Sequence, residues 1–254
     1  MGAHVSREQP LAVAAELEAG CLQLFLSDPQ SFAKPAERED ADDLRASDLD
    51  VYVHAPYLIN VCSPRNNVRH GSRKILQQTC EAAAAIDAAA VIVHAGHAED
   101  GIEAGVARWP RTLELLESEV AVLIENTAGG ENAVGRRLDA LALLWGAIGG
   151  YDGPVELGFC FDTCHAHAAG EPLPEALDRA REITGAIDLL HANDSRDPAG
   201  TGADRHANLG AGEIDPEALR AMIGAAGAPV VCETPGSAAE MRADLDFVRG
   251  ALRR

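Results

Sequence analysis

The sequence predicts an α/β protein that folds as one (β/α)8 TIM barrel, a single domain over residues 1–254. Apolar runs of strand length alternate with helical stretches eight times along the chain. The runs are continuous, which is typical of parallel strands that are buried on both faces. Eight βα units in about 250 residues usually form a closed barrel. A doubly wound sheet is the alternative, but no GxGxxG turn supports it.

Each strand is predicted from an apolar run, and polar segments with Pro and Gly separate the elements. The helix after the sixth strand is expected to begin near Pro174, because proline is favoured in the first turn of a helix. Segment 195–215 far exceeds the usual connection of about two to six residues, which indicates function or disorder. In chain order the predicted elements are a strand ending at His4, helix 10–19, strand 21–27, helix 40–47, strand 51–56, helix 69–89, strand 89–96, helix 101–117, strand 120–126, helix 136–148, strand 155–161, a helix from Pro174, strand 186–194, helix 216–226, strand 228–234 and helix 238–253.

The composition favours a cytoplasmic protein with an aliphatic core. Hydrophobic residues make up 47% of the chain but aromatic residues only 4%, so the interior is expected to be mostly Ala, Leu, Val and Ile. No apolar run approaches the length of a membrane span, and the amino terminus lacks a basic region followed by an apolar stretch. The six cysteines show neither CxxC spacing nor the density of a secreted scaffold, which predicts reduced, buried thiols. Cys160 and Cys164 are the two considered for a direct role.

The charge of the chain argues against a generally basic surface for nucleic acid. The formal net charge is −19, whereas phosphate binding usually depends on Lys and Arg. Three divalent cations would add six positive charges and change −19 to −13, which is still acidic. The lysines are Lys34 and Lys74 alone, so phosphate contacts are expected from arginine, backbone amides and metal.

Six of the eight predicted strands end on a residue that can bind a metal ion. Unpaired polar groups at the ends of buried strands lose their hydration, and a metal ion can compensate them. The carboxyl ends of all barrel strands meet on one face, where these side chains would converge. A single histidine there is more often a hydrogen-bonded structural residue, and a glutamate can pair with arginine, but the conjunction of six favours a metal site. The six residues are His54, His94, Glu125, Asp162, His191 and Glu233.

Three further residues extend this set. His165 follows Asp162 by three residues, and Asp204 and His206 lie two apart in segment 195–215. Residues i and i+2 of an extended segment point the same way, so both side chains can reach one ion. Nine His, Asp and Glu ligands are too many for one zinc and suit three, provided that one carboxylate bridges. A donor set without a clear thiolate is typical of zinc or manganese in a catalytic site.

The motifs around these residues resemble those of the endonuclease IV family, the zinc-dependent apurinic/apyrimidinic endonucleases. The resemblance covers nearly the whole chain, from GAHVS at the start to CETPG near the end, with the motifs in the same order. All nine metal-ligand positions of that family hold a matching residue type here. The motifs are HAPYLIN (54–60), IENTAGG (124–130), DTCHAHAAG (162–170), HANDS (191–195), DRHANLG (204–210) and CET (232–234).

The resemblance implies three zinc ions per chain, with manganese as an alternative at one site, and a catalytic role for Glu125 as the bridge between two ions. The implied reaction is hydrolysis of the phosphodiester immediately 5′ to an abasic deoxyribose in duplex DNA, leaving a 3′-hydroxyl. A monomer that acts on DNA without a membrane partner is expected. The three implied ligand groups are His54, His94 and Glu125; Glu125, Asp162, His191 and Glu233; and His165, Asp204 and His206.

The resemblance also implies contacts with DNA. Tyr57 and Leu58 match side chains that enter the base stack, although packing in the barrel mouth would equally explain them. Arg205, beside two of the ligands, is expected to contact DNA. Gln30 stands where the family often has a wedging arginine, so binding there is expected to depend more on the other contacts. HAGH replaces the longer HPGSH of the family, and the match does not extend to His97, for which we expect a structural role.

Two other classes of function are compatible with these residues. A sugar isomerase or epimerase on the same barrel also gathers His, Asp and Glu at its mouth, and the shortage of basic residues favours it. Such an enzyme needs one or two ions and has no obvious use for the third ligand group. A metal-stabilised binding module without activity is the other alternative, which the complete set of ligands disfavours.

Overall fold

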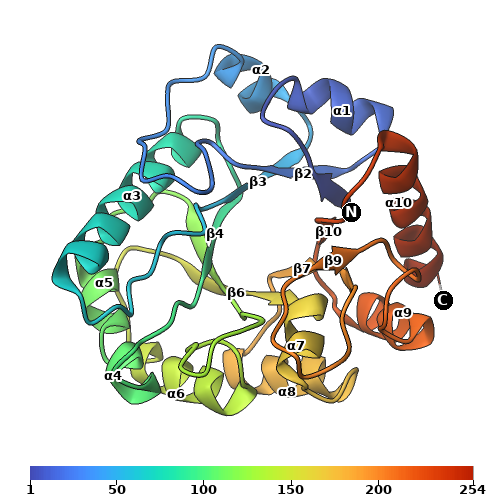
Figure 1. Cartoon of the computed structure of the whole chain (residues 1–254). Helices are drawn as coiled ribbons and strands as arrows, with labels where there is room; N and C mark the ends of the chain where they lie inside the picture. Colours follow the sequence, from blue (N-terminus) through green and yellow to red (C-terminus); the bar gives the residue numbers. More distant parts are fainter. Residues whose placement is uncertain (254) are drawn as a thin grey trace.

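Eight parallel strands close into a barrel, which confirms the predicted fold class. The computed structural model describes residues 1–253. Around the barrel the strand order is β1-β10-β7-β6-β5-β4-β3-β2, and β1 pairs with both β2 and β10. Figure 1 shows the strands at the centre and the helices around them. The barrel strands are β1 (Gly2–His4), β2 (Cys21–Leu24), β3 (Asp50–His54), β4 (Ala90–His94), β5 (Ala121–Glu125), β6 (Leu157–Asp162), β7 (Leu189–His191) and β10 (Val230–Cys232).

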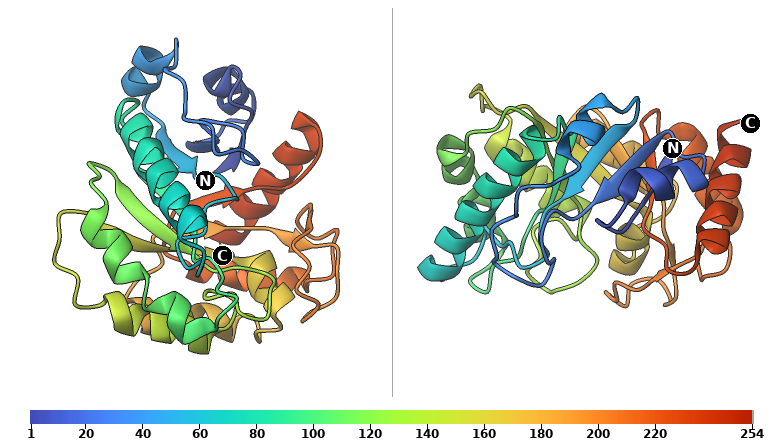
Figure 2. Two further views of the ribbon diagram at one scale, coloured as in Figure 1. Left: turned by 60° about the vertical axis from the view of Figure 1, so that its left-hand side comes forward. Right: turned by 90° about the horizontal axis from the view of Figure 1, so that it is seen from above.

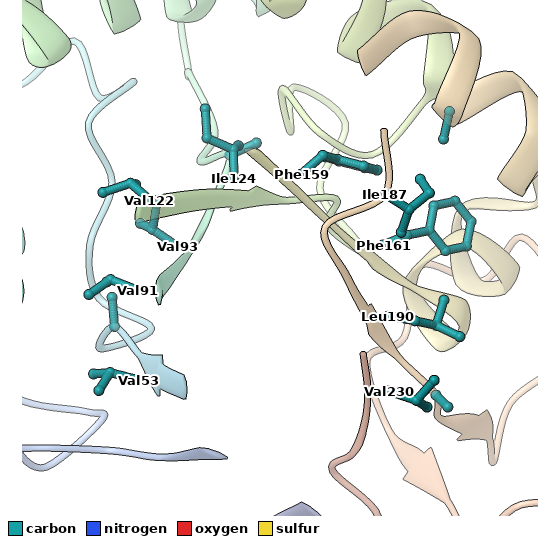
Figure 3. Close-up of a cluster of buried hydrophobic side chains, with 14 of the residues drawn as sticks. Val53, Val91, Val93, Val122, Ile124, Phe159, Phe161, Ile187, Leu190 and Val230 are labelled. Carbon is teal, nitrogen blue, oxygen red and sulfur yellow. The ribbon is translucent and has the colours of Figure 1, made fainter. Parts of the chain in front are cut away.

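Both faces of the barrel strands are buried, because alternate side chains point into the barrel and toward the surrounding helices. Val91, Val93, Phe159 and Phe161 belong to the large outer cluster, part of which Figure 3 shows. Between the two phenylalanines of β6, Cys160 points inward. This burial on both faces accounts for the continuous apolar runs of the sequence. The inner cluster consists of Cys21, Tyr52, Ala90, Ile92, Leu123, Cys160, Leu189 and Val231.

The helices lie around the outside of the sheet (Figure 2). Within residues 1–253, none of them is both long enough and apolar enough to cross a membrane. All six cysteines are buried free thiols, as predicted. The helices are α1 (Pro10–Glu16), α2 (Ala41–Ala46), α3 (Asn66–Ala84), α4 (Ile102–Val106), α5 (Trp109–Leu115), α6 (Leu138–Ile148), α7 (Thr163–Ala169), α8 (Glu175–Thr184), α9 (Pro216–Ala225) and α10 (Ala238–Leu252).

The prediction of one helix over 101–117 is wrong, because α4 and α5 are separate. The chain turns at 107–108, and Pro110 lies in the first turn of α5, where its missing N–H costs no hydrogen bond. Trp109 is fully buried, and its indole N–H donates to the Ala95 carbonyl at 2.9 Å. We attribute the break to this anchoring of Trp109 next to β4, a tertiary contact that helical periodicity does not report.

Helix α7 is absent from the sequence prediction, which places the helix after the sixth strand near Pro174. The Asp162 carboxylate at the end of β6 accepts a hydrogen bond from the His165 amide at 2.7 Å and so caps α7. A residue predicted as a metal ligand therefore also begins a helix. Pro174 is the N-cap of α8, in agreement with the predicted start of that helix.

Segment 195–215 is an ordered segment that packs on the rest of the fold rather than an open loop. It crosses α7, where the Gly202 N–H donates to the Ala168 carbonyl at 2.8 Å. The His167 ring Nε2 lies 3.0 Å from the Asp197 carbonyl. These contacts hold the segment against the carboxyl end of the barrel. Its first residue belongs to β8 (Asp194–Ser195), which pairs in an antiparallel hairpin with β9 (His206–Ala207) in the middle of the segment.

Helix α10 begins with a capping box that allows a test of local stability. The Ser237 side chain accepts from the Glu240 amide, and the Glu240 carboxylate accepts from the Ser237 amide at 2.7 Å. We expect Ser237→Ala to lower the free energy of unfolding by about 1 kcal/mol, because the Glu240 amide loses its side-chain acceptor. Urea denaturation measures the change. Ser6→Ala, in an exposed loop, is the control and should stay within about 0.5 kcal/mol of the parent; an equal loss in both variants would contradict the capping role.

Candidate metal centre

The carboxyl end of the barrel gathers predicted ligands around Glu125. This residue ends β5, and its side chain is fully buried. Its Oε2 lies 3.2 Å from His54 Nε2 and 3.3 Å from His94 Nε2, and its Oε1 lies 2.9 Å from His191 Nδ1. One carboxylate thus contacts histidines from three other strands, which is the arrangement that a bridging ligand needs.

The first predicted group is brought together. The ligand atoms of His54, His94 and Glu125 lie within 4.8 Å of one another. His54 Nδ1 lies 2.7 Å from the Ala55 carbonyl, so a proton on Nδ1 leaves the Nε2 lone pair facing Glu125. His94 also lines the cavity described below, so this group is open to a ligand from that side.

The ligands of the second predicted group also lie close together, and Asn193 forms hydrogen bonds to two of them. The Asn193 Nδ2 donates to Asp162 Oδ2 at 2.6 Å, and its Oδ1 accepts from the Glu233 amide at 2.8 Å. The sequence analysis missed Asn193, which lies two residues beyond the end of β7 at His191. The group, with ligand atoms within 4.8 Å of one another, consists of Glu125, Asp162, His191 and Glu233.

Gln23 and Asn126 hold three of the ligands in place. Gln23 Oε1 lies 2.7 Å from His191 Nε2, and Gln23 Nε2 donates to Glu233 Oε1 at 2.5 Å. The Asn126 carbonyl lies 2.8 Å from His165 Nδ1. Both residues are fully or nearly fully buried. They fix which ring nitrogen of His191 and His165 is free to bind an ion.

The third predicted group meets at Asp204 but is less compact. Asp204 Oδ2 lies 3.2 Å from His165 Nε2, and Oδ1 lies 3.2 Å from His206 Nε2. Each histidine contacts a different carboxylate oxygen, and the set whose ligand atoms all lie within 4.8 Å is Asp162, His165 and His206. The Asp204 side chain is 48% exposed and is the solvent-facing member of the group.

The histidines fit a metal ion. His206 Nε2 is buried without a hydrogen-bond partner among the described residues, while its Nδ1 lies 3.1 Å from the Glu233 carbonyl. His54, His165 and His191 likewise have one ring nitrogen beside an oxygen acceptor and the other beside carboxylates. Histidines that bind a metal usually donate through the second nitrogen in this way. The centre is thus suited to metal binding, and the role of each ligand stays a prediction.

The two cysteines considered for a direct role do lie close to the ligands. Cys160 forms a group with Glu125 and His191, and Cys164 forms one with Asp204. Burial raises the pKa of the Cys160 thiol to about 12 and also raises the pKa of Cys164. Without a bound cation, both thiols are therefore protonated at neutral pH.

Neighbouring carboxylates raise the pKa of His165 and His206 and keep them protonated when no cation is bound. Burial by itself lowers the pKa of His206, but Asp204, Asp162 and Glu233 raise it to about 9. For His165, the nearby carboxylates likewise outweigh burial and hold the pKa well above its usual range. An ion that binds these nitrogens must displace their protons.

We therefore expect zinc binding at pH 7 to release protons and to tighten as the pH rises toward 9. The raised pKa values mean that His165 and His206 carry protons at neutral pH and lose them above the raised value, which for His206 is about 9. Proton release is measured with a pH indicator during zinc titration of the chelator-treated protein. His206→Ala should release fewer protons, and His70→Ala, exposed on α3, should not differ from the parent. Zinc uptake without proton release at pH 7 would contradict this.

A cavity of about 500 Å³ opens beside the ligand groups. His94 and Asp204 form part of its wall. Tyr57 and Leu58 also line it, and they are 50% and 41% exposed. The Tyr57 ring stacks 5.7 Å from the His94 ring. Two exposed apolar side chains therefore border a space that reaches the candidate metal ligands.

The other expected contacts surround this mouth. Gln30 is exposed in the connection after β2. Arg205 is 64% exposed, and its guanidinium forms an ion pair with Asp197. His97 lies next to Asn60, with Asn60 Nδ2 3.1 Å from His97 Nδ1, and the structural role expected for His97 stays a prediction. The roles of Gln30 and Arg205 toward DNA stay predictions.

Comparison with known proteins gives matches over the full length of the chain. The family model described as a xylose isomerase-like TIM barrel matches residues 11–251. A protein of Mycobacterium tuberculosis named probable endonuclease 4 is 55% identical over 251 residues, which cover 98% of this chain and 97% of that protein. The crystal structure of endonuclease IV from Thermus thermophilus superposes with a TM-score of 0.83 at 29% identity and covers 99% of this chain and 98% of that chain.

The sugar-epimerase alternative has a more distant counterpart. A crystal structure described as a D-tagatose 3-epimerase-like protein has a TM-score of 0.78 but only 19% identity, with 99% of this chain and 96% of that chain covered. That likeness shows the shared barrel alone. Because of the family-model match and the 55% identity to the mycobacterial protein, we conclude that the chain belongs to the endonuclease IV family of xylose isomerase-like TIM barrels.

Proposed function

We propose that this protein is a DNA-repair endonuclease that hydrolyses the phosphodiester immediately 5′ to an abasic nucleotide in duplex DNA. The products are a 3′-hydroxyl and a 5′-deoxyribose phosphate. The three ligand groups would hold three zinc ions, with manganese as an alternative at one of them. The observation that carries the proposal is the convergence of His, Asp and Glu side chains around Glu125 in a member of this family.

The protein side chains hold and orient the reacting centre. Bound zinc supplies positive charge that activates water near neutral pH and stabilises the charge that develops on the phosphate oxygens. Glu125 keeps the first two groups at a fixed separation, because its two oxygens contact histidines of both. Asn193 donates to the Asp162 carboxylate and accepts from the Glu233 backbone amide, and so holds these two residues in place. With the charges held in place, no side-chain nucleophile is needed.

Recognition of an abasic site follows from shape. A nucleotide without a base loses little stacking when it leaves the duplex, so extruding it toward the cavity costs less than extruding an intact nucleotide. Tyr57 and Leu58, exposed at the cavity, enter the stack and fill the gap. Gln30 and Arg205 contact the flanking DNA. Asp197 forms an ion pair with Arg205 and offsets the charge of the guanidinium. The contribution of Arg205 to the affinity for DNA is therefore small.

One copy of the chain suffices for this activity in the proposal. The nine candidate ligands of this chain lie together at the carboxyl end of the barrel. We therefore expect a monomeric enzyme with residues 1–254 as its one endonuclease domain. The cytoplasmic location stays a prediction.

The test is incision of a duplex with one abasic site, with the ends identified on a denaturing gel and zinc counted in the same sample. The expected result is a 3′-hydroxyl end from a protein that holds three zinc ions. A duplex of the same sequence without the abasic site is the control. No incision, together with one or two bound ions, would contradict the proposal and favour the sugar isomerase or epimerase.

A further inference from the structure

Asp194 is a buried carboxylate outside the three ligand groups. It lies on β8 and is fully buried. Its Oδ1 accepts from the amides of Ser195 at 2.7 Å and Ile214 at 3.0 Å. Its Oδ2 accepts from the amides of Gly210 and Gly212, each at 3.0 Å. Three of the four donors lie at the far end of segment 195–215, so this one side chain ties the start of the segment to its end.

The close approach around Asp194 depends on a glycine. A Cβ on Gly212 would lie 2.3 Å from the Ser195 carbonyl oxygen and 2.5 Å from Asp194 Oδ1. No real side chain tolerates such distances, so glycine is what lets the amide of residue 212 reach the carboxylate. The glycine at position 212 is thus explained by this contact.

The hydrogen bonds of Asp194 set the position of two candidate ligands. The β8–β9 hairpin pairs Ser195 with His206. The Arg196 N–H donates to the Arg205 carbonyl at 2.9 Å, which continues the pairing toward Asp204. Asp204 and His206 are therefore presented by a segment whose closure depends on Asp194.

The other candidate ligands do not depend on this segment. Of the nine, seven lie at the ends of barrel strands or on α7. Asp204 and His206 alone lie within 195–215. Loss of the Asp194 anchor should therefore act on the third ligand group and leave the first two in place.

A second buried carboxylate holds the stretch that follows β9. Asp244 on α10 accepts from the Leu209 amide at 2.8 Å and from Asn208 Nδ2 at 2.8 Å. It also accepts from the Thr234 hydroxyl at 2.5 Å. Asp244 therefore holds the same segment from α10, but it accepts fewer hydrogen bonds from the backbone of the segment than Asp194 does.

We propose that Asp194 is the positioning residue that assembles the third metal group, separately from the first two. The proposal rests on the three-ion arrangement of the proposed function. An amide in place of the carboxylate has one oxygen and one NH₂ group, so two of the four backbone donors face another donor. Those two amides lose their acceptor, and the segment opens while the barrel stays folded.

The test is Asp194→Asn, with zinc counted per chain after dialysis and trypsin cleavage followed at Arg196 and Arg205, which lie in the segment. We expect the variant to lose one third of its zinc and to be cleaved there at least about tenfold faster than the parent. Asp215→Asn is the matched control, because exposed Asp215 at the end of the same segment accepts one amide, that of Glu217. The control should keep the parent's zinc and cleavage rate.

The full zinc complement and unchanged cleavage in Asp194→Asn would overturn the inference. Loss of all three ions from a folded variant would do the same, because the effect would not be selective. If Asp194→Asn does not fold, Gly212→Ala decides, because its Cβ would lie 2.5 Å from Asp194 Oδ1 and displace the amide of residue 212. Selective loss of one ion then supports the inference, and a full complement refutes it. Fewer than three ions in the parent would count against the proposed function, whereas the cleavage comparison would still test the anchor.

Discussion

Glu125→Gln is expected to abolish incision at an abasic site, with kcat/KM lower by at least about a thousandfold. Glutamine keeps the volume of the side chain but removes its negative charge. One of the two contacts, to His54 and His94 or to His191, would then face an NH₂ group that cannot bind a cation. Because Glu125 belongs to two groups, we also expect zinc at both to be weakened. Single-turnover incision and zinc content measure the two effects.

The control for this variant is Glu103→Gln, which makes the same chemical change on exposed α4. It should cut at the parent rate. Circular dichroism should show a folded barrel in both variants, because Glu125 lies at the mouth and not among the apolar clusters. If folded Glu125→Gln cut at the parent rate, Glu125 would not be a bridging ligand. The assignment of ions to the first two ligand groups would then be wrong.

The double variant Tyr57→Ala/Leu58→Ala is expected to lower incision by about a hundredfold or more, since stacking on a side chain contributes about 1–3 kcal/mol per base. Both side chains border the cavity and are exposed, so their removal costs DNA contact more than it costs packing. The loss should be greatest at low DNA concentration. Incision rates over a range of DNA concentrations separate binding from the chemical step.

Leu143→Ala provides the matched loss of an exposed aliphatic side chain on α6, away from the mouth. It should cut as the parent does. Zinc content distinguishes the two explanations for Tyr57, whose ring contacts His54 and His94. If the double variant loses activity only in proportion to lost zinc, Tyr57 supports the ligands and the proposed contact with the base stack is wrong.

The sequence predicts the barrel well because burial on both faces leaves a direct signal. A continuous run such as 120–126 has no polar face, and eight such runs suit few folds other than a closed parallel sheet. Helix ends follow weaker rules. The break between α4 and α5 depends on where Trp109 is buried, and α7 begins because the Asp162 carboxylate caps it. The Trp109 contact joins residues far apart in the sequence, and the Asp162 cap, although it spans only three residues, leaves no sign in the periodic pattern of apolar residues.

The candidate site likewise has residues that the sequence identifies and residues that it does not. The ends of strands are visible in the sequence, and parallel topology requires those ends to meet, so the residues that converge at the mouth can be named in advance. Asn193 is different, because an amide at a strand end carries no sign of which carboxylate it will bond. Its partners, Asp162 and the Glu233 amide, come from two other strands.

The sequence by itself therefore determined the class of fold, the face of the barrel that carries the site, and the chemical types of donor gathered there. Tertiary structure alone decided which oxygen of Glu125 contacts which histidine, which ring nitrogen of His191 stays free, and how Asp194 closes the segment that presents Asp204. The physical reason is that topology places residues on a common face to within several ångströms, whereas hydrogen bonds and metal ligation depend on tenths of an ångström. Those last distances are set only when the packed barrel fixes every rotamer at its mouth.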